Sequence, residues 1–318
     1  MKGSERSKFW PLLNIAILYN YRFDISVYTF LFVSTIFVNK YVLSVLKFTY
    51  PTVFQGWQTF VAVVVLKILS LRNKLDVTAF DRNAAISIIP HCFYFVGAIV
   101  AGSKALALLP VPVFVCVGNL SGACVFLVAG PSVDRGLVTV TAGLLTLGTA
   151  VSIVVLDVSL PFADSGYSWL LAHVAFVMAQ VFHARDFSSR YTDMDRLYYS
   201  SIFSVVVLAP SSLYLEEAFS ALHFQHRRQL RFYAGCALSG LLGVATQLWA
   251  ARARSEQWSG PARGLAQAVA CCLYVPVFGA SDVAAGLWPF VAANLAAGVF
   301  VPTGLAQDDK GTAVGLDV

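Results

Sequence analysis

The chain has 318 residues, of which 58% are hydrophobic and only 12% are charged. Soluble domains carry about twice that share of charged residues, so the composition excludes a soluble domain and predicts a membrane protein with many spans. The net charge of +5 is modest and the basic residues lie in short loops, which gives no indication of a nucleic-acid partner.

Residues 1–23 are expected to form a cytoplasmic N-terminal leader. Their apolar stretch, from Phe9 to Tyr21, is interrupted by Asn14 and Asn20 and is shorter than the ~20 residues that cross a bilayer. No cleavage site of small residues follows it, which argues against a secretory signal peptide. We therefore expect an interfacial or loosely ordered segment before the first span.

Apolar windows of about 20 residues recur along the rest of the chain. They fall at 24–45, 52–71, 84–102, 105–129, 135–156, 166–184, 194–215, 231–251, 260–280 and 283–303. The fourth window opens with Pro110 and Pro112, which should kink it. The sequence thus predicts an all-α membrane protein with ten transmembrane helices and a cytoplasmic C-terminal tail, 304–318.

The basic residues predict the orientation of these spans. If the N-terminus is cytoplasmic, that side receives 15 of the 22 lysines and arginines and the opposite side receives five, while Lys40 and Lys67 lie within spans. Because loops rich in lysine and arginine stay in the cytoplasm, both termini are expected there.

Ten spans divide into a first five-helix repeat, 24–156, and a second, 166–303. Because five is an odd number, the second half crosses the membrane in the opposite sense to the first, which is the topology of an inverted-repeat transporter. In such transporters the substrate binds between the halves, near the middle of the membrane.

Polar residues within the spans indicate the kind of ligand. No carboxylate lies at the centre of a span, since Asp24, Asp157 and Asp282 are at span ends and the other acids are in loops or tails. Carriers coupled to protons or sodium usually bury an acid, so ion coupling is not expected. The buried amides, hydroxyls and lysine suit a polar, anionic ligand that is rich in hydroxyl groups.

Neither an enzyme nor a metal or cofactor site is expected. The six cysteines lie in apolar runs without a Cys-x-x-Cys pair, which favours buried free thiols over metal ligands or disulfides. No span or loop brings together a nucleophile, a base and an acid, so the sequence offers no catalytic residues.

Asn39 and Lys40 end the apolar run that begins at Ile25. Lys40 lies about 8 Å from the end of its predicted helix, at 1.5 Å per residue. Two interpretations are open: the ammonium contacts a phosphate or sugar of the substrate, or it reaches back to the membrane interface.

Three stretches resemble one known family: VNKYVLSVLKF (38–48), GSKALALLPVPVFVCVGNLS (102–121) and GYSWLLAHVAF (166–176). They are similar to Golgi nucleotide-sugar transporters of the GDP-mannose transporter type, within the drug/metabolite transporter superfamily. The similarity is greatest to an orphan animal branch, transmembrane protein 241. It implies ten helices, cytosolic termini and exchange of a nucleotide sugar for a nucleoside monophosphate.

Two departures from this family bear on the substrate. A Phe-Tyr-Asn-Asn element that reads guanine in the GDP-mannose transporters corresponds here to Tyr198 through Ser201, without its amide pair. Unpaired buried partners are costly, so a UDP-sugar is favoured, with UDP-N-acetylglucosamine as the expected cargo. The family's ninth-helix sugar motif falls at Ala266 to Ala270, where Gln267 and Arg263 are the nearby polar residues.

The resemblance and the buried polar residues together give one set of expected substrate contacts. This set is Asn39, Lys40, Gln58, Tyr94, Lys104, Asn119, Tyr198, Tyr199, Ser200, Ser201, Arg263 and Gln267. The expected protein is a Golgi membrane antiporter, with the endoplasmic reticulum as an alternative location and a homodimer as an expected assembly. Two alternatives stay open: a transporter of phosphorylated metabolites with the same fold, and a non-transporting membrane interaction protein.

The charge distribution makes a direct prediction about topology. Tags placed before Met1 and after Val318 should both be reached by antibodies when only the plasma membrane is permeabilised, because both ends are expected in the cytosol. A C-terminal tag that is stained only after the internal membranes are also permeabilised would contradict an even number of spans.

Overall fold

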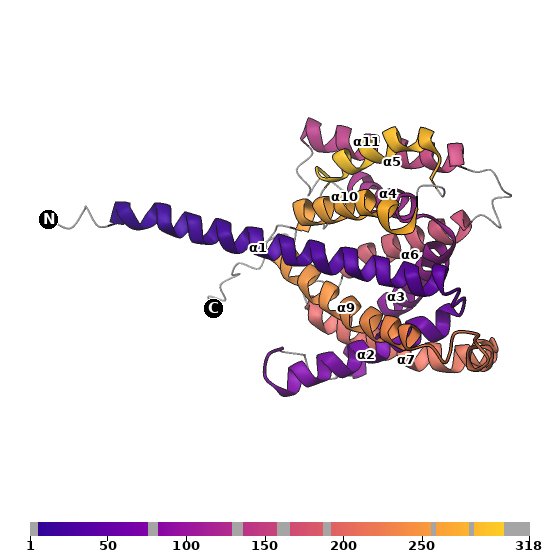
Figure 1. Cartoon of the computed structure of the whole chain (residues 1–318). Helices are drawn as coiled ribbons and strands as arrows, with labels where there is room; N and C mark the ends of the chain where they lie inside the picture. The colour runs from indigo at the N-terminus through magenta and orange to yellow at the C-terminus, as the bar shows by residue number, and fades with distance from the viewer. Residues whose placement is uncertain are drawn as a thin grey trace.

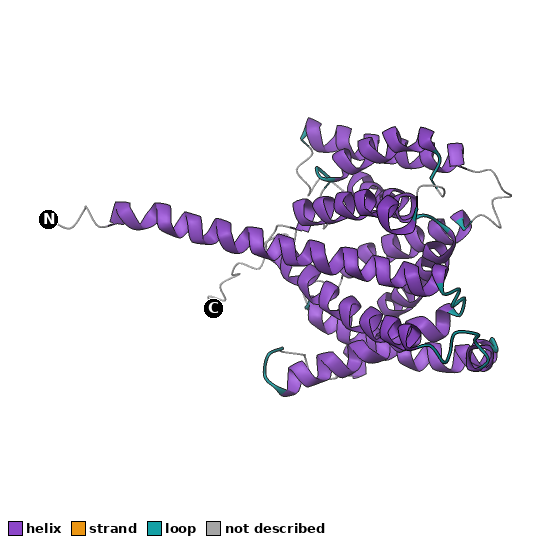
Figure 2. Cartoon of the chain, in the orientation of Figure 1, coloured by secondary structure: helices purple, strands orange, loops and turns teal. Residues whose placement is uncertain are grey.

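The computed structural model describes residues 6–75, 82–128, 136–157, 166–186, 192–255, 259–279 and 283–301. The regular structure in these ranges is helical (Figure 2), as the sequence predicts. The tail expected at 304–318 lies outside the described residues.

Helices alternate with short connections along both halves of the chain (Figure 1). The first half contains α1 (Arg6–Lys40), the π-helical turn η1 (Tyr41–Val45), α2 (Pro51–Leu71), α3 (Arg82–Leu108), α4 (Val111–Val128) and α5 (Leu137–Asp157). The second contains α6 (Tyr167–Asp186), α7 (Asp193–Tyr214), α8 (Glu217–Leu222), α9 (Leu230–Ser255), α10 (Ser259–Phe278), the 3-10 turn η2 (Ala285–Leu287) and α11 (Trp288–Gly298).

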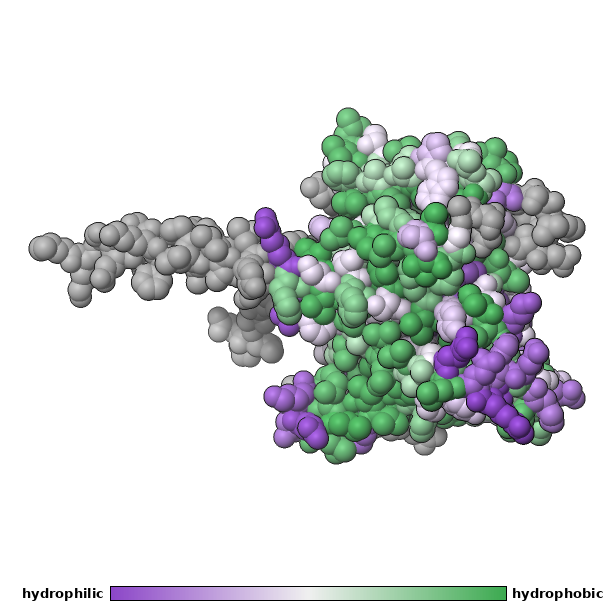
Figure 3. Space-filling model, in the orientation of Figure 1, coloured by the Kyte–Doolittle hydropathy of each residue, from purple (hydrophilic) through white to green (hydrophobic). Residues whose placement is uncertain are grey.

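Nine helices in the described ranges are long and apolar enough to cross a membrane, which establishes a membrane protein with many spans. The window expected at 283–303 forms η2 and the shorter apolar helix α11, so the structure does not establish a tenth span. Large apolar side chains are exposed on the long helices. Figure 3 shows them over the middle of one face, with hydrophilic side chains toward its left and right ends.

The first helix is longer than the span predicted from the sequence. Its membrane-spanning part, Arg22–Val45, agrees with the expected window 24–45. The helix itself begins at Arg6 and projects beyond the other helices (Figure 1), so residues expected to form an interfacial or loosely ordered leader continue the helix. The asparagines that suggested an interruption lower helix propensity by less than ~1 kcal/mol each and do not end a helix.

The two prolines that were predicted to kink the fourth span instead lie at the corner between α3 and α4. Pro110 has no N–H group, so the carbonyl of Leu106 lacks the helical donor four residues ahead. Lys40 Nζ takes its place and donates to Leu106 O at 2.9 Å, to Leu109 O at 2.9 Å and to Ala107 O at 3.4 Å. Because Lys40 is only 5% exposed, the interpretation that it reaches the membrane interface is wrong.

Helix packing repeats itself between the two halves. We pair each helix with the one in the same position of the other half: α1 with α6, α2 with α7, α3 with α9, α4 with α10 and α5 with α11. When each helix is replaced by its partner, a contact in the molecule becomes another contact that is also present. The α1–α9 contact corresponds to α6–α3, the α2–α9 contact to α7–α3, and the α1–α10 contact to α6–α4. The contacts α2–α7 and α5–α11 each join a helix to its own partner in the other half. These two pairs lie at opposite edges of the molecule (Figure 1).

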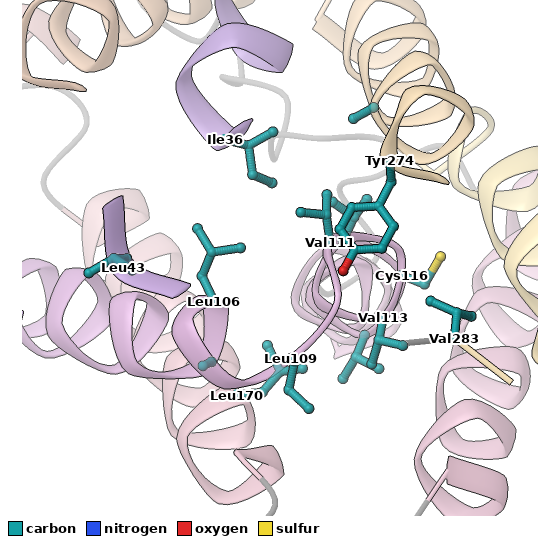
Figure 4. Close-up of a cluster of buried hydrophobic side chains, with 14 of the residues drawn as sticks. Ile36, Leu43, Leu106, Leu109, Val111, Val113, Cys116, Leu170, Tyr274 and Val283 are labelled. Atoms are coloured by element: carbon teal, nitrogen blue, oxygen red, sulfur yellow. The ribbon is translucent and has the colours of Figure 1, made fainter. Parts of the chain in front are cut away.

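The buried core is concentrated at one end of the helices. We name the ends by the orientation that the basic residues predict, so α1 ends and α2 begins at the lumenal end. One large cluster joins residues near the lumenal ends of nine helices, from Ile36 of α1 to Val291 of α11, and several of its side chains converge in Figure 4. Toward the cytoplasmic end the described residues form three small separate clusters.

Substituting Lys40 tests its role at the corner between α3 and α4. Lys40→Met should lower the melting temperature of the protein in detergent, because each buried carbonyl left unpaired costs about 1–3 kcal/mol. The matched control is Lys67→Met, which removes an exposed lysine of α2 and should leave the melting temperature unchanged. Equal melting temperatures for the two variants would show that Lys40 does not stabilise the corner.

Candidate functional site

Three buried amides meet between α4, α10 and α11. Asn119 and Gln267 are reciprocally bonded: Gln267 Nε2 donates to Asn119 Oδ1 at 2.8 Å, and Asn119 Nδ2 faces Gln267 Oε1 at 3.2 Å. Asn119 Nδ2 also donates to Asn294 Oδ1 at 3.1 Å. All three side chains are buried. Since an unpaired amide inside a membrane protein is costly, this reciprocal pairing fixes the position of α4 against α10.

The amide group continues into α5. Asn294 Nδ2 donates to the Thr146 carbonyl at 3.1 Å and to Thr149 Oγ1 at 2.9 Å. Asn294 is completely buried, and its hydrogen bonds join α11 to both α4 and α5. The network therefore spans four helices, two from each half.

Arg263 lies one helical turn before Gln267 on α10 and faces α4. Its Nη2 atom is 3.4 Å from the point that a Cβ atom on Gly122 would occupy. Gly118, one turn earlier on α4, has no atom within 4 Å of the equivalent point. Gly122 thus lets the Arg263 guanidinium approach α4, and Gly118 leaves open space beside it. Guanidinium and amide donors bind anionic oxygens well. We call Asn119, Arg263 and Gln267 the central polar site.

A second polar group joins α1, α2 and α9. Gln58 Nε2 donates to Asn39 Oδ1 at 3.0 Å and also bonds Ser239 Oγ, and Ser239 Oγ donates to Asn39 Oδ1 at 2.8 Å. Asn39 and Gln58, both expected substrate contacts, are therefore brought together. They lie toward the lumenal end, apart from the central polar site.

The other expected substrate contacts lie in separate places. Lys40 binds the end of α3, and Lys104 Nζ lies 4.5 Å from the ring centroid of Trp169 on α6. Tyr94 packs its ring against His183, with centroids 6.2 Å apart. The structure thus gathers three of the expected residues at the central polar site and distributes these three over other contacts.

The four residues on α7 face different partners. The rings of Tyr198 and Tyr199 contact each other, with centroids 5.7 Å apart. Ser200 Oγ points to Cys92 Sγ on α3 at 3.6 Å, and Ser201 Oγ donates to the Leu197 carbonyl of its own helix at 2.7 Å. Both serines are buried, but only Ser200 reaches another helix.

Three side chains of these networks, Asn294, Thr149 and Ser239, were absent from the predicted contacts. Asn294 is the only amide in α11, and that isolation in an apolar helix was a usable indication. Ser239 carried no such indication, because a hydroxyl is common in spans and its importance depends on neighbours from α1 and α2. Within the described ranges, no three His, Cys, Asp or Glu residues are placed to hold a metal ion.

Apolar helices around internal networks of amides, hydroxyls and a cation are typical of a membrane transporter. No family model matches the chain. Individual relatives do: the chain is 36% identical to a Xenopus laevis protein named UDP-N-acetylglucosamine transporter TMEM241 homolog, over 71% of this chain and 76% of the relative. Identity is also 36% to the mouse UDP-N-acetylglucosamine transporter TMEM241, over 68% and 73% of the two chains.

More distant similarity extends to yeast. The GDP-mannose transporter of Schizosaccharomyces pombe is 28% identical over 69% of this chain and 68% of its own length. The chain belongs to the nucleotide-sugar transporter family, in the transmembrane protein 241 branch, as the sequence motifs indicated. The relatives carry the names of transporters, which agrees with the expectation that the protein is not an enzyme.

The central polar site can be separated from a purely structural network by substitution. Asn119→Leu with Gln267→Leu removes both members of the reciprocal pair, so the only acceptor of this network that loses its donor is Asn294 Oδ1. We expect this double variant to fold but to lose at least tenfold in nucleotide-sugar uptake into proteoliposomes, equivalent to about 1.4 kcal/mol. Gln247→Leu, at an exposed amide of α9, is the control. Uptake at the control level in the folded double variant would mean that the amides only join helices.

Proposed function

We propose that the protein is an antiporter that exchanges a cytosolic nucleotide sugar for a lumenal nucleoside monophosphate across the Golgi membrane. The observation that carries this proposal is the central polar site, where Arg263 and two amides lie between α4 and α10 beside a glycine face. The helices α4 and α10 occupy equivalent positions in the two halves of the chain. The site therefore lies where two inverted halves would meet. The endoplasmic reticulum remains the alternative location, and a homodimer is the proposed assembly.

We infer that the cargo is a UDP-sugar, with UDP-N-acetylglucosamine as the proposed substrate. Two observations support this. The relatives at 36% identity are named UDP-N-acetylglucosamine transporters, whereas the GDP-mannose transporters fall to 28% or below. The buried Ser200 and Ser201 also lack the two amides that the family resemblance associates with guanine.

The proposed mechanism needs no coupling ion. The guanidinium of Arg263 would pair with the phosphate groups, and amide groups would bind hydroxyls of the sugar or base. When one phosphate-bearing ligand replaces another, the Arg263 cation stays paired in every step. The carrier thereby avoids an empty site in which this buried charge has no partner. That energetic penalty favours strict exchange over one-way transport.

The structure resembles a carrier open toward the cytoplasm. Among the described residues, the lumenal end is joined by one continuous core, whereas the cytoplasmic end has three separate clusters. In an inverted-repeat carrier the opposite state forms when the halves exchange their packing. Residues 24–156 and 166–303 are the proposed exchanging halves.

The placement of the cations argues against a carrier of small phosphorylated metabolites. Such a ligand needs two or more basic side chains converging on one site. Lys40 binds the backbone of α3 and Lys104 lies over Trp169. Arg263 is therefore the cation at the central polar site, among the residues the structure describes.

Counterflow into proteoliposomes tests the proposed cargo. Vesicles preloaded with UMP should accumulate a labelled UDP-sugar faster than GMP-loaded vesicles accumulate GDP-mannose, because the amides associated with guanine are missing. Preloading with CMP gives a third arm, and empty vesicles give the background. Preferred exchange of GDP-mannose for GMP would overturn the proposed base selectivity, and uptake without any preloaded nucleotide would overturn antiport.

A further inference from the structure

The repeated packing extends to individual contacts on α3 and α9. On α9, Ser239 donates to Asn39 and Thr246 bonds Thr35 at 2.8 Å. A third contact of α9 is the ion pair of Arg252 with Asp24 at 3.2 Å. All three partners are on α1. The contacts are separated by seven and then six residues along α9.

The same spacing occurs on α3, whose partner is α6. His91 bonds Gln180 Nε2 at 3.3 Å, and the Ala98 carbonyl bonds His173 Nδ1 at 2.8 Å. Lys104 then lies over the Trp169 ring. These positions on α3 are again separated by seven and then six residues. The contact positions on α9 and α3 therefore share one spacing, although the partner positions on α1 and α6 are spaced differently.

The polar group around Ser239 on α9 and the group around His91 on α3 differ in how completely they are hydrogen-bonded. At the lumenal end, Ser239, Asn39 and Gln58 bond one another and join α9, α1 and α2. We call these three residues the lumenal gate. Gln58 is the eighth residue of α2 and Ser200 is the eighth residue of α7, so the equivalent group at the cytoplasmic end is His91, Gln180 and Ser200.

This cytoplasmic group is incompletely bonded in the structure. His91 is 6% exposed, and its Nδ1 atom has no hydrogen-bond partner in the described chain. Where Gln180 Nε2 is the donor to His91 Nε2, 3.3 Å away, the neutral ring carries its proton on Nδ1. A buried N–H donor without an acceptor is costly. Ser200 Oγ meanwhile points only to a weakly accepting cysteine sulfur.

We propose that His91, Gln180 and Ser200 form the cytoplasmic gate of the transporter, which is open here while the lumenal gate is closed. In the lumen-open state His91 Nδ1 donates to Ser200 Oγ and joins α3 to α7, as Gln58 now joins α2 to α9, and the bonds of Ser239 are broken. This proposal rests on the alternating-access function proposed above. It explains the orphan donor on His91 and agrees with the separate clusters that the described residues form at the cytoplasmic end.

Two substitutions should shift the balance between the states in opposite directions. Ser239→Ala removes bonds that exist only when the lumenal gate is closed, so it favours the lumen-open state. His91→Leu removes the bond that exists only when the cytoplasmic gate is closed, so it favours the cytoplasm-open state. His91→Asn keeps an N–H donor close to the position of Nδ1 and should behave like the unmodified protein.

Hydrogen–deuterium exchange of the purified protein in nanodiscs, without substrate, measures this shift directly. Exchange in residues 36–46 should rise by about three- to tenfold in Ser239→Ala and fall by a similar factor in His91→Leu, as expected for one hydrogen bond. Equal or same-direction changes in the two variants would overturn the gates. This result does not depend on the substrate.

Exchange kinetics provide the second measurement, because the apparent KM on each side scales inversely with the population of the state open to that side. Ser239→Ala should raise KM for the external UDP-sugar and lower KM for internal UMP, and His91→Leu should do the reverse. Loss of transport of every nucleotide with the deuterium shifts intact would refute the proposed cargo and leave the gates standing. If kcat fell in both variants while the KM values on both sides stayed unchanged, His91 and Ser239 would have only structural roles and the gates would be refuted.

Discussion

The hydrogen bonds from Lys40 to the end of α3 hold the corner on which the lumenal half of the structure depends. A bilayer offers no water to backbone carbonyls, so a helix that ends inside or near it needs internal donors. Pro110 removes one such donor, and the lysine supplies replacements from a different helix. Because α1, α3 and α4 meet at this point, the large lumenal core can close around it. The cation is therefore best understood first as part of the backbone hydrogen-bonding scheme and only then as a neighbour of the substrate path.

The same constraint accounts for the placement of the other internal polar groups. Asn119 and Gln267 satisfy each other, and Asn294 passes the network to α5. Amides paired in this way cost little while they remain together, but each pair also offers donors and acceptors to a ligand that enters between the helices. A transporter needs such groups to be satisfied both with and without substrate. Reciprocal amide pairs between α4 and α10 meet that need, whereas an isolated buried carboxylate would require a proton or a metal ion.

The sequence was sufficient for those features that depend on composition and periodicity. The many-span membrane class and the family follow from apolar windows and motifs, and nine of the ten expected spans are established. Spacing on α10 places Arg263 one turn before Gln267, but the contact of Gln267 with Asn119 of α4 did not follow from the sequence. The partner of Lys40 did not follow, because it is a set of backbone carbonyls more than sixty residues away. Ser239 was missed for a similar reason: its two partners come from α1 and α2. The continuation of α1 through Asn14 and Asn20 shows that single polar residues in a short apolar stretch do not decide whether a helix ends.

The two ends of the molecule are held by bonds of different strength. At the lumenal end a buried ammonium binds backbone carbonyls, and these contacts lie beneath an apolar core that salt cannot reach. At the cytoplasmic end α9 is joined to α1 and α7 by ion pairs, Arg252 with Asp24 and Arg254 with Asp193. Both arginines are about half exposed, but Asp24 is buried and Asp193 is not. Exposed ion pairs such as Arg254 with Asp193 contribute only about 0–1 kcal/mol and are screened by salt. The contact of Arg254 with Asp193 can therefore be broken and remade at low cost, whereas separating Arg252 from the buried Asp24 leaves a carboxylate unpaired and costs more.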